Sequence, residues 1–352
     1  MQNLITIKYI DYMSVISGVY PLKHFNSRKS FLLSLFCLVS LSPSLFITYI
    51  QLKSELTAVN NPSIQALFFG IFRSITIFLN IFVTRLSHLM FRRSKTQGFT
   101  PIDKLFAVNR KLEKLYGTKT KISYFSVYFV IVEGLLIISS ILLVEFNRFI
   151  VLIFLVFLAK YVKLIQWINL LHIIRVNTRS INSMLSNLGK QPVLNDPTSN
   201  LKVYHSLVCI FRELQACSQE LSQIFNPDII SLVVILFLSS LDIPIKILYN
   251  NPTSWTLHIV IYCCNWNLFY LLTVFCSLAA KESQNLSRTI DSTLTHQDCS
   301  EISLQLQVYL SELKDRQLTF STYGMFKVDN SLLPSVFGAI ITYIILILQF
   351  YD

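Results

Sequence analysis

The chain has 352 residues, of which 53% are hydrophobic and only 14% are charged. Soluble globular domains carry about 25% charged residues, so this composition argues against a soluble domain and favours a membrane protein with several spans. The formal net charge of +11 does not indicate nucleic-acid binding, because the basic residues gather in alternate loops, as membrane topology requires.

Seven apolar segments are long enough to cross a bilayer, whose hydrocarbon core of about 30 Å needs about 20 helical residues. They cover residues 31–52, 65–84, 123–144, 149–171, 227–248, 255–280 and 331–350. The first 30 residues lack the small-residue cleavage site of a signal peptide. We therefore expect the first span to act as the insertion signal. The predicted fold is an all-α membrane protein with seven transmembrane helices.

Basic residues set the expected orientation. The N-terminal segment and the second, fourth and sixth loops hold 24 of the 30 Lys and Arg residues. On the opposite side there are only three, Lys53, Arg148 and Lys246. Positive loops remain cytoplasmic, so the sequence predicts a cytoplasmic N-terminus and an extracellular C-terminus. A G-protein-coupled receptor has the opposite orientation.

The predicted organisation has four parts. Residues 1–30 are expected to form a cytoplasmic segment, and residues 31–201 to hold the first four spans and their loops. Residues 202–330 are expected to hold spans five and six together with cytoplasmic anchor helices. Residues 331–352 are expected to form the last helix. Helices are expected over 202–226, continuous with span five, and over about 301–321, because apolar residues recur there at helical spacing. Such helices can pack with each other and with neighbouring subunits, or lie on the membrane surface.

Motifs for other chemistries are missing from the sequence. The seven cysteines include no C-x-x-C pair, and none lies in a predicted external loop, so no extracellular disulfides are expected. The six histidines are scattered, with no pair at metal-ligand spacing, so we expect no metal site and no cofactor. There are no paired catalytic carboxylates within the spans and no pair of broken helices in matching halves, so neither an enzyme nor a transporter is expected.

The last span carries small and polar residues on one face. They are Ser331, Ser335, Gly338, Thr342 and Gln349. With Ile345 at the missing step, these positions recur about every 3.5 residues, which places them along a single stripe. Such a stripe suits close helix packing or the lining of a water-filled path. Its hydroxyls and amide favour the path, in which Ile345 forms an apolar constriction that gates by dewetting.

The C-terminal third resembles the insect gustatory receptor family. Thr342 and Tyr343, five aliphatic residues, Gln349 and Phe350 match the signature that ends those chains. The preceding stretch is similar as well, through Phe320, Gly324, Met325, Phe326, Val328, Asp329, Leu332 and Leu333. The resemblance implies a tetrameric cation channel related to insect odorant receptors, with cytoplasmic helices as a shared anchor and the last helices around a central pore.

The same resemblance assigns roles to residues of the last helix. Gln349 and Phe350 are expected at a gate near the outer end of the pore, and Thr342 and Tyr343 are expected to couple this helix to its neighbours. The family's main sugar receptors carry Glu after the Thr-Tyr pair, whereas this chain has Ile344. This difference favours bitter or other aversive compounds and leaves a fructose-like or internal nutrient ligand open.

Ligand-binding candidates are polar and aromatic residues within the spans. Aromatic rings beside amides suit a small organic ligand. The candidates are Trp266, Tyr262, Asn265, His258, Tyr270, Asp242, Arg73 and Glu133. Arg73 and Glu133 can instead pair with each other, and whether Lys160 and Lys163 form structural pairs or line a pocket is left open.

We therefore expect a taste receptor subunit in the plasma membrane of a sensory dendrite, forming a homo- or heterotetramer that opens a nonselective cation pore. Its expected partners are small tastants, membrane lipids and related subunits. A metabotropic seven-helix receptor is the alternative, which the distribution of basic residues opposes. Asp352 and the terminal carboxylate are expected to ring the outer pore mouth and to concentrate cations.

Overall fold

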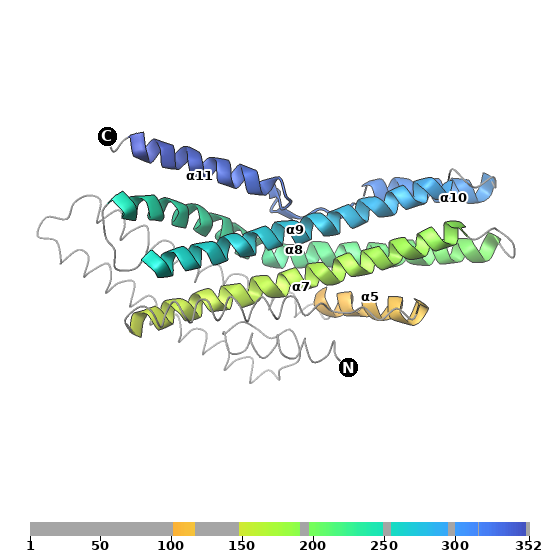
Figure 1. The fold of residues 1–352 in the computed structure, drawn as a ribbon. Coiled ribbons are helices and arrows are strands. Elements are labelled where there is room, and N and C mark those ends of the chain that lie inside the picture. The colour runs from red at the N-terminus through yellow and green to blue at the C-terminus, as the bar shows by residue number, and fades with distance from the viewer. Residues whose placement is uncertain are drawn as a thin grey trace, which may run out of the picture.

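A computed structural model of the chain describes residues 101–116, 148–190, 197–248, 255–294, 300–315 and 317–349. Three long helices form its body: α7 (Arg148–Lys190), α8 (Pro197–Leu248) and α9 (Trp255–Leu294) lie side by side (Figure 1). The predicted spans 31–52, 65–84 and 123–144 lie outside the described residues. The other four predicted spans fall on α7, α8, α9 and α11 (Leu332–Gln349), although Phe350 is not described.

The long helices exceed the thickness of a bilayer. They contain 43, 52 and 40 residues, which at 1.5 Å per residue gives lengths of about 60 to 78 Å, against a hydrocarbon core of about 30 Å. By length and composition, two helices of the described part could cross a membrane, over Lys202–Leu241 and Tyr262–Ser292, and the shorter helix over Leu332–Leu346 is apolar as well.

Contacts between helices fix their relative directions. Lys163 of α7 lies beside Asp228 of α8, and Trp167 beside Phe225, so the residue numbers run in opposite senses and the two helices are antiparallel. Trp266 of α9 contacts Phe337 of α11, and Phe237 of α8 contacts Tyr343 of α11. The end of α11 therefore lies at the same end of the bundle as the start of α9 and the end of α8 (Figure 1).

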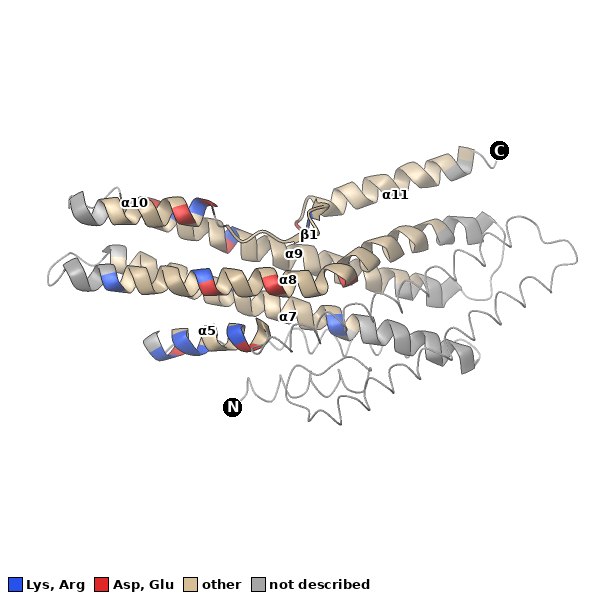
Figure 2. Ribbon diagram, turned by 180° about the vertical axis from the view of Figure 1, so that it is seen from behind, with Lys and Arg blue, Asp and Glu red and all other residues tan. Residues whose placement is uncertain are grey.

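Charged residues separate the described bundle into two halves. Figure 2 shows that Lys, Arg, Asp and Glu gather in the half that contains α5 (Pro101–Tyr116) and α10 (Ser300–Asp315). The half that contains α11 is almost free of charge among the residues described there. An apolar half and a charged half on the same helices are typical of helices that leave a membrane and continue into water.

Helix α5 packs on the charged half of α8. It begins at proline, which is favoured at the first helical position because the missing N–H has no helical partner there. Ile102, Leu105, Val108 and Leu112 recur at helical spacing and are at most 1% exposed. Two exposed ion pairs border this apolar face, Lys104–Glu220 at 2.7 Å and Lys111–Glu213 at 2.6 Å.

The expected cytoplasmic helices are present with one change in extent. Residues 202–226 form part of α8, which continues without interruption into the predicted fifth span. The second helix was expected over 301–321, but α10 ends at Asp315. The chain then forms a short antiparallel hairpin of β1 (Ser321–Thr322) and β2 (Phe326–Lys327), so the prediction was wrong for its last residues.

The hairpin turn explains several residues of the segment that resembles gustatory receptors. Met325 N donates to Thr322 O at 2.9 Å, and the two central residues have positive φ, 48° at Tyr323 and 73° at Gly324. This left-handed pair is the type I′ turn that joins tight hairpins, and glycine adopts it without steric cost. Asp329 then accepts a hydrogen bond from Ser331 N at 2.9 Å and so caps the start of α11.

The hairpin is fixed to two long helices. Leu318 N donates to Ser283 Oγ of α9 at 3.0 Å. With its amide oriented to donate, Asn226 of α8 lies 3.3 Å from Ser321 O. Phe320 packs edge-on against Trp167, whose ring stacks on Phe225 at a centroid distance of 4.9 Å. The connection between α10 and α11 is therefore an ordered part of the core.

Candidate ligand and pore site

Helix α11 presents two different faces. Leu332, Val336 and Ile340 recur every four residues and are 9%, 8% and 3% exposed, so they hold the helix against the bundle. The predicted stripe lies elsewhere on the helix, and all six of its residues are exposed in the single chain. Since the face that packs within the subunit is a different one, the stripe is available to a water-filled path or to another subunit.

Polar groups of the stripe are satisfied locally. Ser335 Oγ donates to Ser331 O and Thr342 Oγ1 donates to Gly338 O, both at 2.9 Å. Serine and threonine bond the preceding helical turn in this way when they have no other partner. A Cβ added at Gly338 would meet nothing within 4 Å. The stripe therefore presents hydroxyls and backbone, with open space at Gly338 in the single subunit.

Aromatic rings connect the ligand candidates of α9 to α11. The Trp266 ring lies 6.2 Å from Tyr262, 5.9 Å from Phe269 and 6.2 Å from Phe337, each in an edge-to-face arrangement. Pairs of this kind each contribute about 0.5–1.5 kcal/mol beyond the area they bury. Trp266 thus touches both the candidate residue Tyr262 and the predicted pore helix.

A second pair of contacts brings α8 into the same region. Ser240 Oγ donates to Tyr262 OH at 3.1 Å, and the Phe237 ring meets Tyr343 at 5.0 Å, nearly perpendicular. We call the six rings Phe237, Tyr262, Trp266, Phe269, Phe337 and Tyr343 the aromatic cluster. Its members come from three helices, so these side chains join α8, α9 and α11 at one place in the bundle.

The other ligand candidates are placed unevenly. Asn265 is fully buried, and Tyr270 is 53% exposed. Asp242 and His258 lie within α8 and α9, but only their backbone is described. Arg73 and Glu133 fall outside the described residues. Among the four candidates whose side chains are described, Tyr262 and Trp266 are the two that are joined to α11 through the aromatic cluster.

Residues that the sequence did not single out complete this region. They are Phe337 of α11 and Phe237 and Ser240 of α8. Their roles depend on contacts between helices that are distant in sequence, which a local pattern does not encode. The i, i+4 spacing of Tyr262 and Trp266 was the one local signal, because it places both rings on one face of α9.

The structure resolves the open question about Lys163. Its Nζ lies 2.7 Å from Asp228 Oδ2, and the two side chains are 7% and 1% exposed. The ammonium also lies over the Phe225 ring, 5.8 Å from its centroid. Lys163 is therefore half of a buried ion pair between α7 and α8. The side chain of Lys160 is not described.

Apolar helices of membrane length, with a charged half beyond them, are typical of a helical membrane protein. The chain belongs to the 7tm chemosensory receptor family, which matches residues 7–352. This is a family of membrane receptors and not of enzymes.

Similar proteins include insect taste receptors. The chain is 31% identical over 72 residues to gustatory receptor 28b and 29% identical over 92 residues to gustatory and pheromone receptor 32a, both of Drosophila melanogaster. These matches cover 20% and 25% of this chain but only 15% and 19% of the relatives' own lengths.

Two solved structures share the fold. The insect olfactory receptor OR5 from Machilis hrabei superposes with a TM-score of 0.73 at 15% identity, over 99% of this chain and 98% of that one. The same receptor in complex with eugenol gives a TM-score of 0.65 at 16% identity, over 97% of each chain. At this identity the likeness shows the fold alone.

Proposed function

We propose that the chain is a subunit of a ligand-gated, nonselective cation channel that responds to small organic tastants at the plasma membrane of a sensory neuron. Four subunits place their α11 stripes around a central pore, with the N-terminus in the cytosol and the C-terminus outside. Gln349 and Phe350 form the gate, and Ile345 forms an apolar constriction.

The observation that carries this proposal is the position of Trp266. It lies between Tyr262, in a region suited to a small ring-bearing ligand, and Phe337 of α11. A ligand shifts a channel toward its open state only if it binds that state more tightly. The aromatic cluster supplies a direct route, because a ligand that displaces Trp266 changes the packing of the pore helix.

The expected ligand class rests on the side chains around Trp266. Aromatic rings beside the buried amide Asn265 suit a compact aromatic or heterocyclic molecule, and eugenol, bound by the structurally similar olfactory receptor, is a molecule of that kind. Ile344 stands where the main sugar receptors carry a carboxylate. Bitter or aversive aromatic compounds are therefore the first ligands to test.

The test is recording of ligand-evoked currents in cells that express the full chain, with surface labelling to measure the receptor at the membrane. Phe337→Ala should lower the sensitivity to ligand by about fivefold or more, because coupling energies between sites are typically 1–3 kcal/mol. Ile341→Ala, one turn further along α11 and 41% exposed, is the matched control.

Equal effects of the two substitutions would contradict the role of the aromatic cluster. Ligand-evoked signals that require G proteins and carry no direct current would overturn the channel assignment itself.

A further inference from the structure

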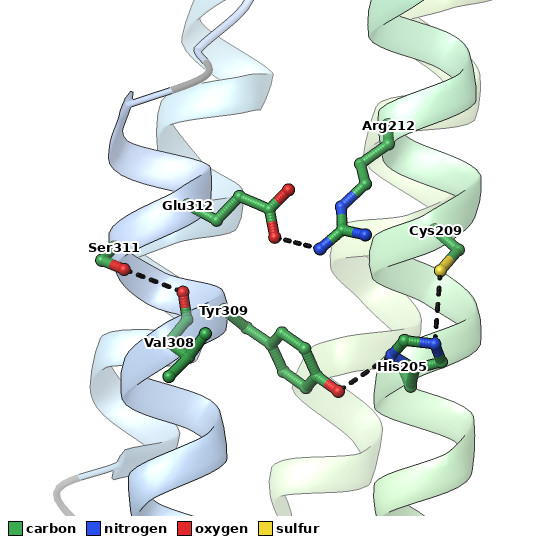
Figure 3. Close-up of polar contacts among 7 residues, drawn as sticks. All are labelled: His205, Cys209, Arg212, Val308, Tyr309, Ser311 and Glu312. Atoms are coloured by element: carbon green, nitrogen blue, oxygen red, sulfur yellow. Dashed lines mark hydrogen bonds and ion pairs between the residues drawn. The ribbon is translucent and has the colours of Figure 1, made fainter.

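The charged half contains a group of side chains that the proposed channel function does not use. On α8, His205 and Cys209 are one helical turn apart, and α10 places Tyr309 and Glu312 opposite them (Figure 3). His205 Nδ1 lies 3.0 Å from Tyr309 OH, and His205 Nε2 lies 3.6 Å from Cys209 Sγ. The imidazole therefore bridges a phenol on one helix and a thiol on the other.

The sequence predicted no metal site because no two histidines stand at ligand spacing, but here the second ligand is a cysteine. We propose that His205 and Cys209 form a two-ligand site for a first-row transition-metal dication, of which Zn²⁺ is the best chemical match. Zinc binds thiolate sulfur at about 2.3 Å and imidazole nitrogen at about 2.0–2.1 Å, which in tetrahedral geometry places the two ligand atoms about 3.5 Å apart. His205 Nε2 and Cys209 Sγ are 3.6 Å apart, which already matches this ligand-to-ligand distance, so metal binding requires little rearrangement.

Tyr309 prepares the histidine for this role. The tautomer with hydrogen on Nδ1 donates to the Tyr309 oxygen and leaves the Nε2 lone pair facing Cys209 Sγ. Metal-binding histidines almost always donate their other N–H in this way, which fixes the ring orientation.

The charged side chains near His205 and Cys209 allow a metal cation to bind there. Arg212, on the same side of α8, forms an ion pair with Glu312 of α10 (Figure 3), so its positive charge is balanced at the interface. His205 is exposed and Cys209 is half-buried, so an ion can reach both from water. On coordination the thiol releases its proton to solvent and the thiolate binds the metal.

The site is suited to exchangeable binding. In the described part of the chain, no group of three or more His, Cys, Asp or Glu side chains could hold a metal ion. Two protein ligands leave the remaining coordination positions to water, unlike a closed structural zinc site with four. A bound ion would hold His205 against Tyr309 and so stabilise the contact between α8 and α10.

Cobalt titration of the purified full-length protein tests this site without any channel activity. Co²⁺ occupies zinc sites and gives a sulfur-to-metal absorption band in the near ultraviolet when a thiolate binds. The wild-type band should be removed by added Zn²⁺. It should be lost in both Cys209→Ser and His205→Gln. Tyr309→Phe should keep the band but weaken binding about tenfold.

Cys263→Ser is the matched control, because Cys263 is an exposed free thiol on α9 with Ile259 and Asn267 at the positions one turn away. This variant should titrate like wild type, and size-exclusion profiles identify any variant that fails to fold. No sulfur band in wild type, or a band that survives in a folded Cys209→Ser or His205→Gln variant, would overturn the proposal.

Discussion

The buried ion pair between Lys163 and Asp228 has a large energetic consequence if one partner is lost. Removing two charges from water costs several kcal/mol per ion, and their attraction offsets this cost only while both partners are present. Lys163 and Asp228 are 7% and 1% exposed, so neither can be solvated if the other is lost. In the exposed pair Lys104–Glu220, the two side chains are 44% and 41% exposed, and such a pair contributes about 0–1 kcal/mol to the stability of the folded protein.

This contrast gives a stability prediction. Lys163→Met leaves the Asp228 carboxylate buried and uncompensated, which should destabilise the protein by about 3–5 kcal/mol, while Glu220→Gln should change stability by less than about 1 kcal/mol. Thermal unfolding midpoints of purified protein measure both. The double variant Lys163→Met with Asp228→Leu should recover most of the loss, and equal midpoints for the two single variants would show that the pair is not desolvated.

The hairpin between α10 and α11 is the element that the local sequence pattern predicted least well. The sequence places apolar residues at helical spacing through Leu313 and Phe320, and this spacing predicted one helix to 321. The chain instead turns, because Tyr323 and Gly324 adopt left-handed φ and Phe320 packs against Trp167. The packing of Phe320 on a residue 153 positions earlier in the chain lies beyond any local pattern.

Substitutions at two glycines test the left-handed backbone conformation of the hairpin turn. Neither has any atom within 4 Å of an added Cβ, but Gly324 has φ of +73° and Gly338 lies in the helical interior of α11. Gly324→Ala should therefore destabilise by about 1–2 kcal/mol through backbone strain alone. Gly338→Ala should stabilise α11 by about 0.5–1 kcal/mol. Thermal unfolding midpoints measure both, and a Gly324→Ala midpoint at or above that of wild type would refute the positive-φ turn.

The helices were easier to predict from the sequence than the hairpin. The helix over 202–226 and its continuation into the fifth span were predicted from the spacing of Leu207, Ile210, Leu214, Leu221 and Ile224, and α8 confirms both. Periodicity reports which face of a helix is apolar, and this is a local property. The partner of that face is not local. For this reason Asp228 was not recognised as the counter-ion of Lys163, and His205 was not recognised as a neighbour of Tyr309.

The separation into a charged half and an apolar half runs along the long helices. The helices α8 and α9 run through both halves, and α11 contributes only to the apolar one (Figure 2). For the proposed channel, we expect the helices to be held at the charged end by α5 and α10 and to move relative to one another at the other end, where the aromatic cluster meets α11. We therefore expect ligand responses to depend on packing around Trp266 more than on the charged contacts.

The orientation of the two halves across the membrane gives the last prediction. Positive loops favour the cytosol, and the basic residues of α5 and α10 lie in the half opposite the end of α11 (Figure 2). An epitope tag fused after Asp352 should therefore stain in intact cells, whereas a tag fused before Met1 should stain only after permeabilisation. Surface staining of the N-terminal tag alone would place the charged half outside, and would remove the α11 stripe from an outward-facing pore mouth.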